Sequence, residues 1–257
     1  MKVAPDMLLR AKFHVVLLAT LTIAFACGQA SAADGLNPSQ KKDVEKVVQD
    51  YIQKNPEILI QAIQEYQIRQ RIAERERAKK SLVTLGPDLR QNKNSPVIGN
   101  PNGDVTIVEF FDYRCGYCKR VFPTIQALLK EDGNIRYVLK EYPILGPDSL
   151  IASQASLAVW EQEPKKYLPL HTALMKVRGQ LNQTKILNVA RKLGINTDML
   201  QKGMKGVMVR GELNKNMELA EALGISGTPA FVIGQQLVPG ALSKEELKKL
   251  IATARKG

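Results

Sequence analysis

Two cysteines separated by two residues are the side chains of this chain best suited to chemistry. Cys115 and Cys118 belong to "VEFFDYRCGYCK", residues 108–119, and the apolar run before them is typical of a buried strand. A C-x-x-C pair can be a structural disulfide, part of a metal site or a redox centre. The other ligands in the sequence and the compartment of the protein decide between these three.

The chain lacks enough partners for a structural zinc site, which takes about four ligands. Apart from Cys27 and His14 near the N-terminus, the only further cysteine or histidine is His171, far from the pair in sequence. A Cu(I) site accepts fewer soft ligands and stays open as an alternative. An inert disulfide would close a loop of only two residues, so it would restrain little of the unfolded chain. We therefore expect no bound metal and favour a redox centre.

Cys115 falls where the expected strand gives way to a helix. At a helix start, unpaired backbone N–H groups and the helix dipole favour negative charge, which lowers the pKa of a thiol. The thiolate is the nucleophile in disulfide exchange, and a second cysteine one turn along can resolve the mixed disulfide. Cys118 occupies that second position.

The N-terminus has the pattern of an export signal. Lys2, Arg10 and Lys12 precede an apolar run from Phe13 to Cys27, and "ASA" at residues 30–32 is a small-x-small cleavage site. Residues 1–32 are therefore expected to be removed as a signal peptide.

Two other interpretations of this segment stay open. The uncharged stretch from Phe13 to Ala33 is just long enough for a membrane anchor. A lipoprotein would use Cys27, although "AFAC" lacks the usual leucine three residues before the cysteine.

The formal charge is +12, and removal of residues 1–32 takes away three basic residues and one acidic residue, leaving +10. Lys and Arg alternate with Asp and Glu along helical stretches without an aromatic-basic motif. This pattern indicates a solvated basic surface, and no nucleic acid partner is expected.

Residues 39–80 predict two amphipathic helices. Asn55 and Pro56 mark the start of the second helix, and the segment 69–80 is almost wholly charged. An isolated helix pair cannot bury its apolar stripe, so the stripe packs either on its own domain or on a second copy of the chain. "GPDLRQNKNSP", residues 86–96, has the composition of a polar linker. The stripes comprise Val44, Val47, Val48, Tyr51 and Ile52 in the first helix and Leu59, Ile63, Tyr66, Ile68 and Ile72 in the second.

After residue 96 the pattern alternates between strands and helices, which predicts an α/β fold with a mixed sheet. An all-helical block interrupts this order, and Pro123 is expected to kink the first helix. The expected elements are strands at 104–113 and 134–144, helices at 116–130, 149–203 and 211–223, short strands at 230–234 and 235–240, and a last helix at 243–255.

Together, "VEFFDYRCGYC" and the downstream "GISGTPAFVIG" resemble the DsbA family of periplasmic thiol–disulfide oxidoreductases, over about residues 97–256. The resemblance implies a thioredoxin fold with a helical insertion at about 149–205, and domains at 1–32, 33–90 and 91–257. It makes Cys115 the attacking cysteine, Cys118 the resolving cysteine and Pro229 a cis-proline beside them. A cis-proline can bring extended backbone against the cysteines and leave its amide groups for a bound peptide.

Glu109 lies within the apolar strand, six residues before Cys115. It could be the exposed end of an edge strand, whereas the resemblance suggests a buried acid that influences proton transfer, with Lys140 as a possible counter-charge. His171 is expected to be a partly exposed helical residue. The methionines are expected to fill gaps between helices rather than to bind copper: Met199, Met204, Met208 and Met217.

Two departures from strongly oxidising members refine the expected activity. Gly116 and Tyr117 stand between the cysteines where those members carry Pro-His, and Tyr cannot stabilise the thiolate as a charged His does. Thr228 before the cis-proline, together with the N-terminal helices, resembles the oligomeric, ScsC-like members that also isomerise disulfides. The resemblance implies that Gly116, Tyr117, Thr228 and Pro229 contact substrate.

We therefore expect a periplasmic oxidoreductase of a Gram-negative bacterium that forms and isomerises disulfides in exported proteins. Its N-terminal helical segment would join two copies, with three as the alternative, and paired sites would keep a substrate captured. No cofactor beyond the redox-active disulfide is expected. A membrane redox partner of the DsbB or DsbD type would restore the oxidation state of the cysteine pair after each reaction. The alternatives are a monomeric DsbA-type oxidase and a non-catalytic Cu(I)-binding protein.

Overall fold

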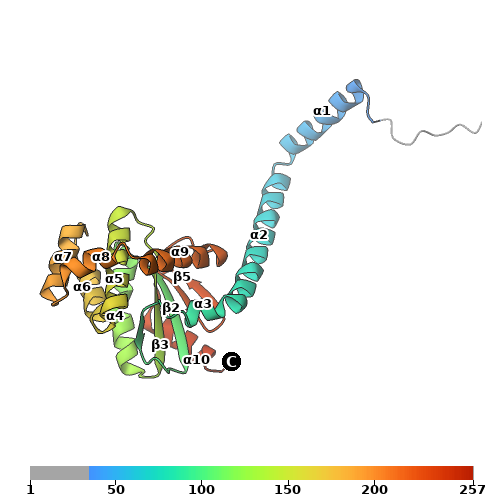
Figure 1. Ribbon diagram of the computed structural model, residues 1–257. Coiled ribbons are helices and arrows are strands. Elements are labelled where there is room, and N and C mark those ends of the chain that lie inside the picture. Colours follow the sequence, from blue (N-terminus) through green and yellow to red (C-terminus); the bar gives the residue numbers. More distant parts are fainter. Residues whose placement is uncertain (1–34, 257) are drawn as a thin grey trace, which may run out of the picture. The chain divides into compact units, whose positions relative to one another are not determined.

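The computed structural model describes residues 35–256, so the expected signal peptide lies outside the described residues. The described residues fall into two units, one up to Ile60 and one from Gln61 onward, which are described separately. Two helices follow one another at the start: α1 (Pro38–Lys54) and α2 (Glu57–Thr84), the second of which continues into the second unit (Figure 1). Within residues 35–256, no helix is long and apolar enough to span a bilayer.

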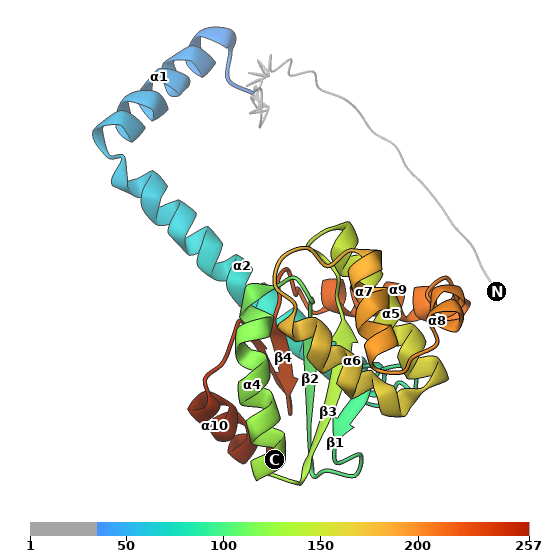
Figure 2. The same cartoon turned by 90° about the vertical axis from the view of Figure 1, so that its left-hand side faces the viewer.

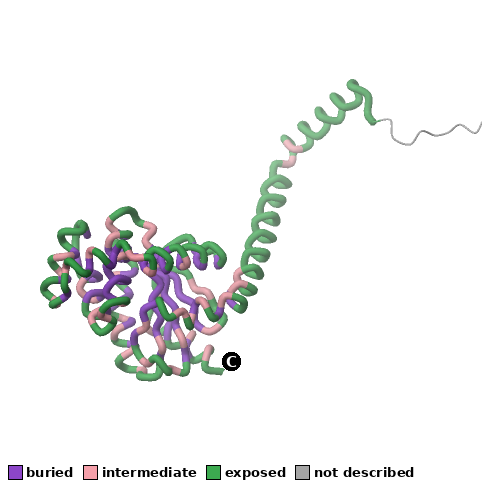
Figure 3. The backbone as a smooth tube through the Cα atoms, in the orientation of Figure 1, coloured by how far each residue is buried: buried purple, intermediate pink, exposed green. Residues whose placement is uncertain are grey.

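The two helices that the sequence predicted at the N-terminus are present. Asn37 caps α1 through a capping box with Gln40, and Asn55 caps the other end of α1. Almost every residue of α1 and of the first turns of α2 is exposed to solvent (Figure 3). The exposed residues include the large apolar side chains of the predicted stripes: Val44, Val47, Val48, Tyr51, Leu59, Ile63, Tyr66, Ile68 and Ile72.

The second unit is built on a five-stranded sheet, which is mixed as predicted. Its strand order is β1-β3-β2-β4-β5, with β2 and β3 parallel and the other pairs antiparallel. The sequence did not predict β1, because it is three residues long and buries only Ile98. The strands are β1 (Val97–Gly99), β2 (Val105–Phe111), β3 (Ile135–Glu141), β4 (Ala230–Ile233) and β5 (Gln236–Pro239).

Helices cover both faces of the sheet. Ile107 and Phe111 of β2 face one core, which α4, α10 and the inserted helices complete (Figure 2). Val108 and Phe110 face the other core, against the end of α9 and the α2–α3 region. The helices are α3 (Gly86–Arg90), α4 (Gly116–Glu131), α5 (Pro147–Gln162), α6 (Pro164–Lys176), α7 (Gln183–Lys192), α8 (Thr197–Gly203), α9 (Val207–Ala222) and α10 (Lys244–Ala254).

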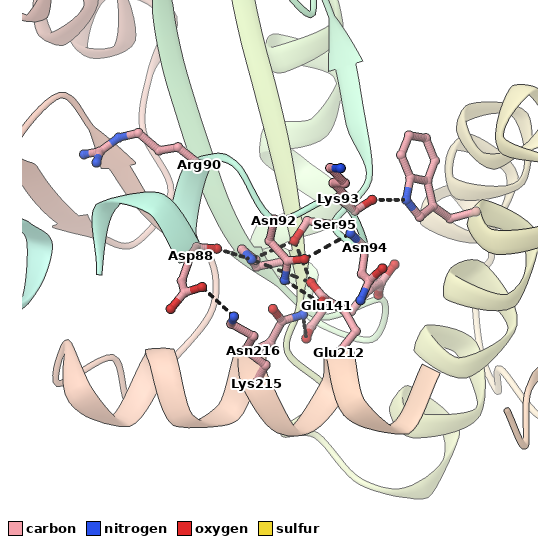
Figure 4. A network of polar contacts seen from close by, with 12 residues as sticks. Asp88, Arg90, Asn92, Lys93, Asn94, Ser95, Glu141, Glu212, Lys215 and Asn216 are labelled. Atoms are coloured by element: carbon pink, nitrogen blue, oxygen red, sulfur yellow. Dashed lines mark hydrogen bonds and ion pairs between the residues drawn. The ribbon is translucent and has the colours of Figure 1, made fainter. Parts of the chain in front are cut away.

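The segment 86–96 is not the polar linker that its composition suggested. It contains the short helix α3, and Leu89 is completely buried in the second core. Its polar residues bind buried partners, as Figure 4 shows for Ser95 and Glu212 of α9. The segment therefore belongs to the folded body, because its polar side chains are satisfied inside the protein instead of by water.

A buried ion pair joins this segment to the sheet. The Nζ of Lys140 lies 3.6 Å from a carboxylate oxygen of Glu212, and both side chains are inaccessible to solvent. Ser95 bridges the two, because its hydroxyl accepts from Lys140 at 2.7 Å and donates to Glu212 at 2.6 Å. Asn92 donates to the second oxygen of Glu212 at 2.7 Å. Such a pair is stable only because hydrogen bonds complete it.

Lys140 is therefore not the counter-charge of Glu109 that the sequence suggested. Glu109 is in register with Leu139 of β3, and neighbouring residues along a strand point to opposite faces. Lys140 thus faces the α9 side of the sheet, whereas Glu109 faces the side of α4.

Trp160, the one tryptophan of the sequence, lies on α5 within the helical insertion. Its indole packs edge-on against Tyr167 of α6 with the ring centres 5.8 Å apart. The indole N–H donates to the carbonyl oxygen of Lys93 at 3.4 Å. The side chain thus lies where the insertion contacts the segment 86–96.

Candidate active site

Cys115 lies at the N-cap of α4, directly after β2. The turn between strand and helix is held by Asp112, a buried acid that the sequence did not single out. Its Oδ1 accepts hydrogen bonds from Arg114 N and Ser149 Oγ, each at 2.7 Å, and its Oδ2 accepts one from Leu145 N at 3.0 Å. The turn is therefore fixed from both the α4 side and the helical insertion.

The two cysteines are free thiols whose pKa values are shifted in opposite directions. The pKa of Cys115 is lowered to about 5, chiefly by its hydrogen bond with Cys118, against the raising effect of burial. Hydrogen bonds with the Thr228 side chain and with the backbone amides of Cys118 and Tyr117 lower it further. The pKa of Cys118 is raised, first by the same hydrogen bond with Cys115, then by burial and by the charge of Glu109. Cys115 is thus the thiolate of the pair, and Cys118 keeps its proton.

The loop before β4 passes close to the first cysteine. The carbonyl oxygen of Thr228 lies 3.2 Å from the Cys115 sulfur, and the Thr228–Pro229 peptide bond is cis. A hollow of about 460 Å³ opens beside this loop, lined by Tyr117, Thr228 and Pro229 among others. Thr228 contacts the sulfur and also lines the hollow, so the two lie beside the same loop.

Tyr117, between the cysteines, is directed to solvent and is 58% exposed. The guanidinium of Arg120 lies 4.8 Å from the centre of its ring, a distance typical of a cation–π contact. Tyr117 thus presents an apolar face beside the sulfur, at the edge of the hollow.

Glu109 is buried, at 3% exposed, so the alternative of an exposed strand end is wrong. Its carboxylate accepts a hydrogen bond of 2.7 Å from the hydroxyl of Tyr137, on the neighbouring strand. Burial raises the pKa of Glu109 to about 8, and the charge of Cys115 adds to this, while the Tyr137 bond opposes it. The charge of Cys115 raises the pKa of Glu109, and the charge of Glu109 raises the pKa of Cys118, so the three groups are electrostatically coupled.

His171 was expected to be partly exposed, and this prediction is wrong. The ring is completely buried, and its Nδ1 lies 2.8 Å from the Tyr113 hydroxyl. Aromatic rings surround it, including Tyr167, which stacks on it. Burial lowers its pKa to about 3, so the ring is neutral. It packs the junction between the sheet and the insertion and does not reach the cysteines through any hydrogen bond found among the described residues.

A second buried acid at this junction was missed by the sequence reasoning. Glu141 ends β3 and accepts hydrogen bonds from the hydroxyls of Tyr113 and Tyr167 at 3.1 Å and of Ser153 at 2.8 Å. Burial raises its pKa, although these three bonds oppose the rise. The only signal in the sequence was a Glu at the end of an apolar strand, which is also common at a solvent-exposed strand end.

Comparison with known proteins agrees with this geometry. Residues 106–252 match the DSBA-like thioredoxin domain, and residues 40–73 match the copper resistance protein ScsC N-terminal domain. A thioredoxin-like oxidoreductase from Silicibacter pomeroyi is 43% identical, with a TM-score of 0.64, covering 66% of this chain and 98% of that one. ScsC from Proteus mirabilis, in a transitional conformation, is 31% identical, with a TM-score of 0.64, covering 86% and 99%.

Curated relatives differ in length. The disulfide bond formation protein D of Bacillus subtilis is 25% identical over 175 residues, which are 64% of this chain and 79% of the relative. The chain matches only about a quarter of the Na(+)/H(+) antiporter NhaA 1 of Salinispora arenicola, at 26% identity over 178 residues. The family model spans more than half of the chain and includes both cysteines and the cis-proline. The chain belongs to the DSBA-like thioredoxin domain family of thiol–disulfide oxidoreductases, among its ScsC-like members.

Proposed function

We propose that this protein forms and isomerises disulfide bonds in exported proteins through Cys115 and Cys118. The observation that carries the proposal is the Cys115 thiol at a helix start, with a lowered pKa and the Thr228 carbonyl 3.2 Å away. A thiolate in this position is a nucleophile and also a good leaving group in disulfide exchange.

Oxidation of a substrate proceeds from the disulfide form of the pair. A substrate thiolate attacks the Cys115 sulfur, the Cys115–Cys118 bond breaks, and Cys118 leaves with both electrons and takes up a proton. A second substrate thiolate then attacks the substrate sulfur of the mixed disulfide and releases Cys115 as a thiolate. The substrate loses two electrons and the pair gains them.

Isomerisation starts from the dithiol form. The Cys115 thiolate attacks a wrong substrate disulfide, forming a mixed disulfide and releasing a substrate thiolate. A different substrate thiolate then attacks the mixed disulfide at the substrate sulfur, so a new pairing forms and Cys115 is released. No net electrons are transferred, and Cys118 serves as an escape by resolving stalled mixed disulfides.

Glu109 is the proposed proton acceptor for Cys118 when that thiol must attack a mixed disulfide. Its raised pKa of about 8 places proton exchange near neutral pH, where an acid–base group works best. Gly116, Tyr117, Thr228 and Pro229 are the proposed substrate contacts, since they border the hollow or the sulfur.

The isomerase component of the proposal rests on assembly. The apolar stripes of α1 and α2 are exposed, with Leu59 at 46%, Ile63 at 55% and Tyr66 at 58%. We propose that a second copy of the chain covers these stripes, giving a homodimer with two active sites facing one substrate. A trimer is the alternative, and the molecular mass of the protein in solution distinguishes the two. The proposed domains are a removed leader at 1–32, an assembly segment and the redox body. The assembly segment is proposed to end near residue 80 instead of the expected 90, because Leu82 and Leu89 are buried in the core of the redox body.

The proposed compartment is the periplasm, which suits a redox-active thiol pair behind an export signal. A solved relative is described as a periplasmic thioredoxin-like protein from Salmonella enterica serovar Typhimurium, at 27% identity. The partners proposed are cysteine-containing exported proteins and a membrane redox protein of the DsbB or DsbD type.

Insulin reduction and refolding of scrambled ribonuclease test the two activities separately. We expect the mature protein to do both and Cys115→Ser to do neither. Cys118→Ser should still form mixed disulfides but should release them slowly. Titration of the reduced protein with Cu(I) tests the rival function: copper binding by a protein inactive in both assays would replace the proposal with a copper carrier.

A further inference from the structure

A second hollow adjoins the one beside the cysteines. It has a volume of about 810 Å³, larger than the 460 Å³ of the first. The two share three lining residues, Gly224, Leu237 and Pro239, so one opens beside the other. A chain that leaves the Cys115 site past Thr228 and Pro229 can continue into the second hollow.

Helix α2 forms one wall of the second hollow. Glu74, Arg75, Arg77 and Ala78 line that wall, and the end of α9 and strand β5 supply the other lining residues. From Gln61 onward, α2 belongs to the same compact unit as β5. The hollow thus joins the redox body to the helix that precedes it in sequence.

The β5 side of the hollow suits an extended polypeptide. Strand β5 is the last strand of the sheet order, and among the described residues no strand pairs with its outer edge. A free edge offers backbone N–H and C=O groups to an added extended segment. Leu237 and Pro239 supply apolar surface, and charges of both signs surround it, including Glu74 and Arg77. A chain of mixed polarity fits this lining better than a compact, singly charged ligand.

We infer that the second hollow binds the stretch of substrate polypeptide on one side of the reacting cysteine. This rests on the proposed function and deepens it, because it assigns α2 to substrate binding. Only one flank is bound, since the hollow lies on one side of the Thr228–Pro229 loop. The occupant is a non-native segment without secondary structure of its own, and it lies between α2 and β5.

Peptide oxidation by the disulfide form measures this binding. The probes are a short peptide with one central cysteine pair, and two longer peptides extended by about eight mixed-polarity residues on either the N-terminal or the C-terminal side. Eight extended residues reach roughly 26 Å, enough to leave the first hollow. We expect one extension to raise kcat/KM about fivefold, roughly the effect of burying one methylene group, and the other to change it little.

Ala78→Trp should abolish the gain from the favoured extension by filling the hollow, and leave the rate with the short peptide unchanged. Ala73→Trp is the matched control, because Ala73 is on the same helix but exposed and outside the hollow. Arg77→Glu, at an exposed position of the same wall, is a second variant that requires no repacking, and it should reduce the gain at least twofold.

The outcomes separate the inference from the function beneath it. Failure to oxidise even the short peptide would remove the proposed function. Equal kcat/KM for all three peptides, equal gains from both extensions, or a full gain retained by Ala78→Trp and Arg77→Glu would overturn the inference while the function stands. Unchanged unfolding midpoints and Cys115 titration ensure that a lost gain reports binding.

Discussion

At the scale of single residues, the acidity of Cys115 decides the chemistry. Its pKa of about 5 arises chiefly from a hydrogen bond with Cys118, so the reduced form is stabilised as a thiolate. Thiolate absorbance of the reduced protein should titrate near pH 5. Because the folded pKa lies below the unfolded value, this stabilisation is full above about pH 8.5 and is lost as the pH falls to 5. A titration midpoint at or above pH 8 would contradict the catalytic assignment.

The same hydrogen bonds predict the effect of Thr228→Val. The substitution keeps the shape but removes the hydroxyl, so the pKa of Cys115 should rise and the redox behaviour of the pair should shift. The reduction potential and scrambled-ribonuclease refolding are the measurements, with the unfolding midpoint as control. If neither property changes, Thr228 only supports the backbone at the cis-proline.

Glu109 should affect the pH dependence of stability in the opposite direction from Cys115. Burial raises its folded pKa to about 8, above the value of about 4.3 for an unfolded chain. The unfolded state loses its proton first, so this residue lowers the free energy of unfolding as the pH rises from about 4 to 8. Glu109→Gln cannot ionise at this position, so the free energy of unfolding of the variant should rise relative to wild type as the pH increases from about 4 to 8.

The measurement for Glu109 is urea unfolding of both proteins as disulfides, in which the cysteines do not titrate. Desolvation is the main cause of the shift and does not depend on the cysteine thiolate. A stability difference that is flat between pH 4 and 8 would show that Glu109 does not carry a raised pKa. In turnover assays, the same variant should slow the release of mixed disulfides.

The sequence predicted the residues that lie within recognisable local patterns. Cys115 and Cys118 stand at a strand–helix junction, and Thr228–Pro229 precedes an apolar strand, so adjacent residues identify them. Asp112 and Glu141 could not be found in this way. Their partners come from the helical insertion, which is distant in sequence, and only the folded chain brings them together.

At the scale of elements, the segment 86–96 is the main difference between expectation and structure. Its sequence is polar, yet it supplies Leu89 to the core and Ser95 and Asn92 to a buried network (Figure 4). Sequence patterns do not distinguish a polar residue that pairs with a buried charge from one that faces water. The sequence also does not show that the charges of Lys140 and Glu212 are buried, because their burial depends on how the strands and α9 pack.

Two truncations test the place of this segment. Deletion of residues 33–90 removes the buried side chains Leu82 and Leu89, each worth about 2–5 kcal/mol, and should leave an unstable body. Deletion of residues 33–73 keeps both side chains and should unfold at nearly the urea concentration of the full chain. Equal midpoints for the two truncates would mean that the segment contributes nothing to the fold.

The buried ion pair gives a prediction at the same scale. Lys140→Met leaves Glu212 charged, buried and without its cation, which should cost about 3–5 kcal/mol of unfolding free energy. Replacing both residues, as Lys140→Met with Glu212→Leu, should recover most of the loss. Since Lys140 faces away from Glu109, the Cys115 titration should not move in either variant. A shifted titration would mean that the two faces of the sheet are electrostatically coupled.

At the scale of the whole molecule, assembly is the property that the exposed stripes predict. Leu59→Glu with Ile63→Glu would bury unpaired charges in any interface built on this stripe, at a cost of several kcal/mol. The double variant should therefore sediment as a monomer, keep insulin reduction and lose scrambled-ribonuclease refolding. Val207→Glu is the control, because Val207 is 79% exposed and lies on α9, outside the stripe. A monomeric wild type, or a monomeric variant that isomerises normally, would end the assembly proposal.

The order of elements and the family were predictable for the whole molecule because each depends on short, strongly patterned segments. The strand order was not, since a mixed sheet can be threaded in several ways with the same alternation of elements. The placement of β1 at an edge, beside β3, depends on three residues paired antiparallel to a distant strand. Pairing of so short a strand is decided by its neighbours rather than by its own composition.

The position of Trp160 provides an optical reporter that needs no labelling. As the one tryptophan of the chain, it makes the intrinsic fluorescence specific to the contact between α5, Tyr167 and Lys93. Its emission would follow melting of the redox body, while far-ultraviolet circular dichroism also records the helices at 38–54 and 57–84. A fluorescence transition that lags the dichroism would reveal that the N-terminal helices melt as an independent cooperative unit.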